Sequence, residues 1–181
     1  DESSNVLRCV ATDGHRLARV DADLPANASS MPGIIIPRKT VGELGKLLND
    51  DDVDIAVSVS ETKVRFATSE IQLTSKVIDG TFPDYSRVIP SGNTKRLEVD
   101  AAEFARAVDR VSTVSSERSR AVKLALDEDR LVLSVNAPDN GAADEEVAVS
   151  YGDEQLEIGF NAKYLLEIAG QVDRENAVFM F

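Results

Sequence analysis

Three apolar stripes with helical spacing, roughly sixty residues apart, constrain the fold of this chain more than any other feature. In each stripe, apolar residues recur every three or four positions, as in a helix with one buried face. The first stripe follows Ile34–Lys39, which predicts an apolar strand and then a proline close to a helix start. The stripes consist of Val41, Leu44, Leu47 and Leu48; Phe104, Val108 and Val111; and Tyr164, Leu165, Ile168 and Ala169.

The two later helices begin with good capping residues. Asp100 and Glu103 form a capping-box-like pattern, and Asn161 is a favourable N-cap. Between the helices the apolar period falls to two, which predicts antiparallel strands. The alternating positions are Val53, Ile55, Val57 and Val59; Val64 and Phe66; Ile71 and Leu73; Val122, Leu124 and Leu126; Leu131, Leu133 and Val135; Val147 and Val149; and Leu156 and Ile158.

One unit of strand, helix and several antiparallel strands therefore recurs, which predicts an α+β fold with helices on one face of antiparallel sheets. Pro138–Gly141 has the composition of a turn between two strands, and Pro90–Thr94 that of a linker. We therefore predict two domains, residues 1–93 and 94–181. Because Ala177–Phe181 begins an apolar strand with no partner strand after it, we interpret the chain as part of a longer polypeptide.

The composition indicates a globular protein with an aliphatic core, since 43% of residues are hydrophobic and only 5% are aromatic. The single cysteine, Cys9, lies in a strand pattern, and we expect it to be buried as a small hydrophobe. The sequence shows no apolar run of membrane-spanning length and no basic-then-apolar leader. These features fit a reducing cytoplasm.

The net charge of −12 argues at first sight against a nucleic-acid partner, because DNA-binding domains are usually basic. Cations nevertheless gather on the predicted helices, away from the apolar stripes, at Lys39, Lys46, Arg106, Arg110, Lys163 and Arg174. Acidic runs occupy the predicted loops and strands, at Asp50–Asp52, Asp127–Asp129, Asp144–Glu146 and Asp153–Glu154. Two interpretations stay open: ordinary solvated helix faces, or a basic surface that holds DNA without sequence preference.

The run Val10–Ala18 carries the most informative candidate residues. Asp13-Gly14 predicts a tight hairpin turn, because glycine accepts a positive φ, and His15, Arg16 and Leu17 follow just beyond it. One hypothesis is a hydrolase in which His15 and Asp13 or Asp84 act as acid and base. The sequence offers it no nucleophile motif, glycine-rich phosphate loop or metal-ligand cluster. An isolated histidine is more often structural, and Asp50–Asp52 is better interpreted as a solvated turn than as a metal site.

Four long strings together resemble the bacterial sliding clamps, the β subunit of the replicative DNA polymerase, over essentially the whole chain. They are VATDGHRLA at 10–18, IIIPRK at 34–39, DGTFPDYSRVIP at 79–90 and EIGFNAKYLLE at 157–167. The resemblance implies a clamp fold in which two three-domain subunits close into a ring around duplex DNA, with helices lining the hole. It makes residues 1–93 the later part of the middle domain and residues 94–181 most of the last domain.

The resemblance also implies two functional surfaces and neither a catalytic residue, a metal nor a cofactor. The first is a pocket for short peptides, with Leu17, Pro83 and Val88 as an apolar cleft and Thr12, Gly14, His15, Arg16 and Arg87 around it. The second faces DNA: Arg38 and Lys39 match the family's basic pair, and Lys46 lies further along that helix. Arg106, Arg110 and Lys163 follow from the helix faces alone. The implied partners are double-stranded DNA, the polymerase catalytic subunit, the clamp loader, repair polymerases and a second copy of the subunit.

A third hypothesis is a free-standing peptide-binding module that uses the pocket and never touches DNA. Ring closure separates it from a sliding clamp, because a closed ring stays on circular DNA and runs off linear ends. A simple binder shows no such difference.

Overall fold

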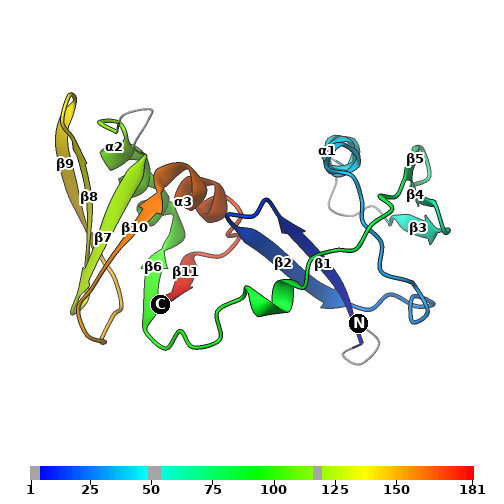
Figure 1. The fold of residues 1–181 in the computed structure, drawn as a ribbon, viewed down its shortest axis with the longest axis horizontal. Helices are drawn as coiled ribbons and strands as arrows, with labels where there is room; N and C mark the ends of the chain where they lie inside the picture. The colour runs from blue at the N-terminus through cyan, green and yellow to red at the C-terminus, as the bar shows by residue number, and fades with distance from the viewer. Residues whose placement is uncertain (1–4, 49–53, 116–119) are drawn as a thin grey trace. The chain divides into compact units, whose positions relative to one another are not determined.

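The computed structural model describes residues 5–48, 54–115 and 120–181, and the chain divides into two compact units, Asp1–Val88 and Ile89–Phe181 (Figure 1). Its helices and antiparallel sheets confirm the predicted α+β class. Helices α1, α2 and α3 begin at residues 38, 101 and 162, so the predicted spacing of the helices is also confirmed. Asp50–Asp52 and Val53 lie outside the described residues. None of the described helices is both long and apolar enough to cross a membrane.

The described residues of the first unit form a β-hairpin, an α-helix, a three-stranded sheet and a short 3-10 helix. Strands β1 (Val6–Thr12) and β2 (Leu17–Asp23) form the hairpin, with Thr12 opposite Leu17. The remaining elements are α1 (Arg38–Leu47), the antiparallel sheet β3-β4-β5 (Ala56–Val59, Lys63–Ala67 and Gln72–Lys76) and the 3-10 helix η1 (Tyr85–Arg87). A hydrogen bond of 2.7 Å between the hydroxyl oxygens of Thr40 and Ser75 joins α1 to β5.

The strand predicted at Ile34–Ile36 is wrong. The run has no strand structure, although Ile35 O accepts a hydrogen bond of 2.8 Å from Ile78 N. No further ladder bond joins it to the described part of the unit. A short apolar run has no periodicity that identifies a strand, so its composition alone could not establish one.

The second unit is built around a four-stranded antiparallel sheet of order β10-β7-β8-β9, with β6 and β11 paired separately. Its elements are β6 (Arg96–Asp100), α2 (Ala101–Ser112), β7 (Ala121–Asp127), β8 (Arg130–Ala137), β9 (Gly141–Ala148), β10 (Leu156–Asn161), α3 (Ala162–Ala169) and β11 (Asn176–Met180). The final apolar strand, β11, therefore has a partner: it pairs with β6, which lies near the start of the unit in the sequence (Figure 1).

Both predicted N-caps are confirmed. Asp100 Oδ1 accepts a hydrogen bond of 2.6 Å from Glu103 N, and Asn161 Oδ1 accepts one of 3.0 Å from Lys163 N. The turn Pro138–Gly141 also joins β8 to β9, with Gly141 at a φ of +99°. These features depend on neighbouring residues, which is why a local pattern predicts them.

The predicted stripes are buried to different extents. In α2 the stripe Phe104, Val108 and Val111 is fully buried in the core of the second unit. In α3 Leu165 is buried, but Ile168 is 49% exposed, and Ala162 is buried instead. The prediction for α3 is therefore partly wrong, because α3 packs against α2 and this contact selects the face that is covered.

The first unit buries less of its apolar surface. Val64 and Phe66 are its buried hydrophobic side chains among the described residues, whereas Val41 and Leu47 of the α1 stripe are 54% and 39% exposed. Cys9, expected to be buried, is exposed opposite Val20. The reason is that β1 and β2 form a two-stranded sheet, and no described segment of the unit covers this face.

Candidate functional site

The turn between β1 and β2 is a four-residue loop, Asp13–Arg16, that its own side chains stabilise. Asp13 Oδ1 accepts hydrogen bonds of 3.0 Å from His15 N and 3.1 Å from Arg16 N. Thr12 Oγ1 accepts one of 3.2 Å from Gly14 N and donates one of 2.8 Å to Arg16 O. Gly14 has a φ of +85°, which favours glycine. The predicted hairpin is confirmed, but His15 and Arg16 lie within the turn and Leu17 begins β2.

These bonds bear on the hydrolase hypothesis. The amides of His15 and Arg16, together with the Arg16 guanidinium, hold the pKa of Asp13 below its usual value. A carboxylate stabilised as an anion in this way is a weak general base. Asp84 is also occupied, since its Oδ2 lies 2.9 Å from Arg87 Nε and its Oδ1 accepts a hydrogen bond from Ser86. Both carboxylates therefore serve local structure.

The second predicted pocket segment, Pro83–Val88, lies around η1. Val88 N donates a hydrogen bond of 3.1 Å to Tyr85 O, and the rings of Phe82 and Tyr85 meet edge to face at 6.3 Å. The side chain of Arg87 is 84% exposed and Val88 is 69% exposed. An apolar side chain and a cation are thus presented together at the surface of the first unit.

Arg8 links the hairpin to this segment. Its Nε and Nη2 donate to Asp21 Oδ1 and Oδ2 at 2.8 and 2.9 Å, and its Nη1 lies 3.5 Å from Tyr85 OH. Arg19 Nε also donates to Asp21 Oδ1 at 3.2 Å. Hydrogen bonds from Arg8 and then Arg19 hold the pKa of Asp21 far below its usual value. The hairpin and η1 therefore meet through a charged cluster.

This cluster lies some distance from the predicted pocket residues of the turn. Arg8 pairs with Asp21 in the ladder, whereas Thr12 pairs with Leu17 beside the turn. The four steps along the strand from Arg8 to Thr12 span about 13 Å. Sequence reasoning missed Arg8 and Asp21, because only the strand register shows that they are opposite each other.

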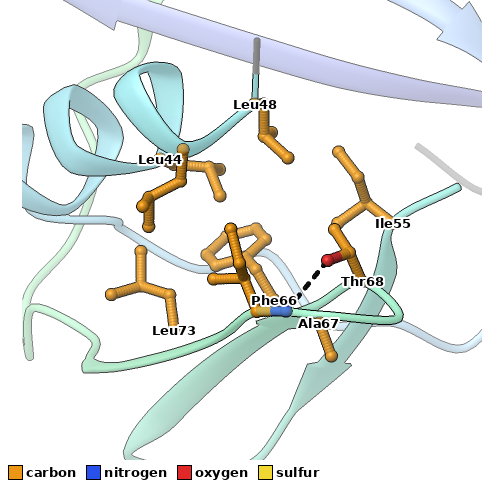
Figure 2. A pocket seen from close by; sticks show the side chains of 9 residues that line it. Leu44, Leu48, Ile55, Phe66, Ala67, Thr68 and Leu73 are labelled. Atoms are coloured by element: carbon orange, nitrogen blue, oxygen red, sulfur yellow. Dashed lines mark hydrogen bonds between the residues drawn. The ribbon is translucent and has the colours of Figure 1, made fainter. Parts of the chain in front are cut away.

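A small apolar hollow lies between α1 and the β3-β4-β5 sheet. Figure 2 shows Leu44 and Leu48 from the helix side facing Phe66 and Leu73 of the sheet. The cavity volume is about 10 Å³, close to the minimum for a single water molecule. We interpret it as a packing gap in the core of the first unit.

A larger open hollow, of about 500 Å³, lies on the second unit between the end of α2 and the start of α3. Ser112 and Ser115 line one side, and Arg120, Lys163 and Glu167 are also among its lining residues. Ala162 N donates a hydrogen bond of 2.8 Å to Arg120 O, which places this arginine beside α3. The helix-face argument could not find Arg120, because its position follows from the pairing of β7 with β10.

Three of the six predicted DNA-facing cations have no ion-pair partner within the described ranges: Arg38, Lys39 and Arg106. Arg38 and Lys39 are exposed in the first turn of α1, which contains no acidic residue. The helix dipole disfavours cations there by about 0.3–1 kcal/mol each. Helix stability alone therefore does not favour Arg38 and Lys39 at the start of α1.

The other three predicted cations have acidic neighbours. Lys46 Nζ lies 3.0 Å from Glu43, and Lys163 Nζ lies 3.8 Å from Glu167. Arg110 Nε donates to the two carboxylate oxygens of Glu145 on β9 at 3.1 and 2.9 Å, and this contact lowers the pKa of Glu145. Part of the predicted basic surface is therefore neutralised locally. No group of three or more His, Cys, Asp or Glu side chains in the described regions is placed to hold a metal ion.

Comparisons with known proteins match both parts of the chain to one protein family. Residues 1–84 match the family model of the central domain of the DNA polymerase III beta subunit, and residues 86–181 match its C-terminal domain. The beta sliding clamp of Caulobacter vibrioides is 51% identical over 175 residues, which are 97% of this chain and 47% of that relative. The beta sliding clamp of Pseudomonas aeruginosa is 38% identical over 178 residues, which are 98% of this chain and 48% of that relative.

A solved structure shows the same likeness. The sliding clamp from Bartonella birtlesii bound to griselimycin is 54% identical, with a TM-score of 0.91 over 97% of this chain and 48% of that one. The fold is therefore that of the DNA polymerase sliding clamps. The chain spans about half the length of the curated relatives it matches. It belongs to the family of the bacterial DNA polymerase III beta subunit.

Proposed function

We propose that the full-length protein carrying this sequence is a processivity factor, a clamp that encircles duplex DNA without sequence specificity and tethers the replicative polymerase to it. The observation that carries the proposal is the match of residues 1–84 and 86–181, in order, to two domains of one clamp family. A closed ring keeps the polymerase on DNA because the ring encircles the duplex. Such a clamp is an accessory subunit and performs no catalytic step itself. Two copies would close the ring. In it, residues 1–93 are the later part of the middle domain and residues 94–181 most of the last.

The DNA-facing surface would consist of the cations on the helices, Arg38, Lys39, Lys46, Arg106, Arg110 and Lys163. Phosphate contacts through such side chains carry no sequence information. Arg38, Lys39 and Arg106 are free of ion-pair partners in the described part of the chain, so they would supply most of the attraction. The acidic neighbours of the other three would keep it weak, which suits a protein that must slide.

The client surface would be a peptide pocket. Leu17, Pro83 and Val88 would receive apolar side chains, and His15, Arg16 and Arg87 would contact amide and carboxylate groups, beside Thr12 and Gly14. The exposure of Val88 and Arg87 and the hydrogen-bonded turn around Gly14 support this assignment. The sliding clamp from Bartonella birtlesii, a relative, has been solved bound to griselimycin. The clients would be the polymerase catalytic subunit, the clamp loader and repair polymerases, in the bacterial cytoplasm at the nucleoid.

The decisive experiment loads the full-length protein onto nicked circular DNA with its clamp loader and measures retention before and after the DNA is linearised. We expect stable retention on the circle and rapid loss after cutting. Equal retention on both forms would contradict a topological link. If retention is equal on both forms and the protein still binds the peptide, the hypothesis of a free-standing peptide-binding module is favoured.

A further inference from the structure

The contact between Arg8 and Tyr85 joins two parts of the proposed peptide site that are far apart in sequence. One part is the hairpin, which carries His15, Arg16 and Leu17. The other is Pro83–Val88, which follows β5 through residues without strand or helix structure. A segment that lacks ladder bonds has many accessible conformations, so its position depends on side-chain contacts.

Arg8 is suited to hold such a segment. A guanidinium group has several donors in one plane, and here two of them bind both oxygens of Asp21 while a third approaches Tyr85 OH at 3.5 Å. Arg8 and Asp21 are directly opposite each other in the ladder, so the pair is aligned by the strands themselves. Their side chains are only 21% and 30% exposed, which reduces screening by solvent.

We propose that Arg8 and Asp21 are positioning residues that hold Tyr85, and with it Pro83–Val88, against the β1–β2 hairpin. The spacing between the apolar cleft and the polar residues of the peptide site then depends on this cluster. The inference rests on the proposed peptide site and extends it to residues that touch no peptide.

The charge balance of the cluster supports this role. Asp21 receives hydrogen bonds from Arg8 and Arg19, and they hold its pKa far below the ordinary value. The carboxylate therefore stays ionised at neutral pH. Because Arg19 still donates to Asp21 when Arg8 is replaced, a substitution at Arg8 leaves the Asp21 carboxylate with a partner, and the hairpin should still fold.

The test uses the full-length protein with Tyr85→Phe, Arg8→Met and the double variant. Tyr85→Phe keeps the ring against Phe82 and removes only the hydroxyl. The probe is a fluorescein-labelled peptide that carries Leu and Phe side chains next to an amide and a carboxylate, followed by anisotropy. Arg130→Met is the matched control, because Arg130 also lies beside acidic groups of neighbouring strands, at 3.5 Å from Glu146.

We expect about three-fold weaker binding for both Tyr85→Phe and Arg8→Met, within the range for loss of one hydrogen bond, the one between Arg8 and Tyr85. The double variant should also be about three-fold weaker, because Arg8 acts through the Tyr85 hydroxyl. Arg130→Met should bind like the parent protein. The thermal unfolding midpoint should change as little in Tyr85→Phe as in the control, while the amide NMR shifts of residues 84–88 move.

Each contrary result has a distinct meaning. A loss of about ten-fold in the double variant would show independent effects and overturn positioning through Tyr85. Parent-like binding by Tyr85→Phe, while Leu17→Ala weakens the peptide, would overturn the positioning role and leave the proposed site standing. Parent-like binding by both Leu17→Ala and Arg87→Ala would instead remove the site itself. If Arg8→Met fails to fold, Tyr85→Phe and its NMR shifts decide the matter.

Discussion

Leu17 is apolar and Arg87 is charged, and both side chains lie outside the core. Leu17 is half-buried at the first position of β2, and the Arg87 side chain is 84% exposed. We expect Leu17→Ala and Arg87→Ala each to weaken peptide binding about ten-fold, a loss of about 1.4 kcal/mol, because each removes a contact group. Fluorescence anisotropy with the labelled peptide measures the loss.

Thermal unfolding provides the control for these variants. Val20→Ala is the matched substitution, since Val20 lies on the same strand and is 66% exposed. All three variants should unfold close to the parent protein. A large loss of stability for Leu17→Ala alone would place that side chain in the core rather than in a binding site.

Lys39 tests the DNA-facing surface. We expect Lys39→Glu to shorten retention on circular DNA and to leave peptide binding intact, because it reverses a charge at the exposed start of α1. The glutamate should also suit the helix dipole better than the lysine does. Lys63→Glu, an exposed change on β4, gives the same change in net charge away from the helix. Equal effects of the two substitutions would remove Lys39 from the DNA-facing surface.

At the scale of the element, local sequence predicted the helix starts well and the buried faces less well. A cap joins residues two or three positions apart, as in Asp100 to Glu103 N at 2.6 Å, so a short pattern contains all its parts. A buried face needs a covering neighbour. Phe104 has one in the core of the second unit, whereas Val41 lacks one among the described residues of the first.

The cap of α2 makes a direct stability prediction. Asp100→Ala should lower the free energy of unfolding of the full-length protein by about 1 kcal/mol, because Glu103 N loses its acceptor. Asp109→Ala, near the other end of the helix, is the control and should be neutral or slightly stabilising. Urea unfolding monitored by circular dichroism measures both. The cap has no structural role if Asp100→Ala is as stable as Asp109→Ala.

At the scale of the whole molecule, several carboxylates have partners that lower their pKa. For Asp21 these are Arg8 and Arg19, and for Glu145 the partner is Arg110. The folded protein then binds fewer protons than the unfolded chain around pH 4, so the contribution of these groups to stability is complete above about pH 5. It is lost as the pH falls through the folded-state pKa values.

We therefore expect the free energy of unfolding to fall as the pH is lowered from about 5 to 3, and to fall less steeply in Asp21→Asn and Glu145→Gln. Urea titrations at a series of pH values measure these slopes. The control is Glu70→Gln, because Glu70 is an exposed carboxylate near the turn between β4 and β5. If all the slopes coincide, these ion pairs do not contribute to acid stability.

The sequence by itself determined the helix starts, the hairpin at Asp13-Gly14, the α+β class and the family, because each depends on contiguous residues or long specific strings. The residues assigned to the peptide and DNA surfaces remain predictions. Only the tertiary structure decided that β11 pairs with β6, that Ile34–Ile36 forms no strand and that Cys9 and Ile168 are exposed. It also brought Arg8 to Asp21 and Tyr85. Pairing and burial depend on which distant segment lies alongside, and that information is not contained in the period of any one segment.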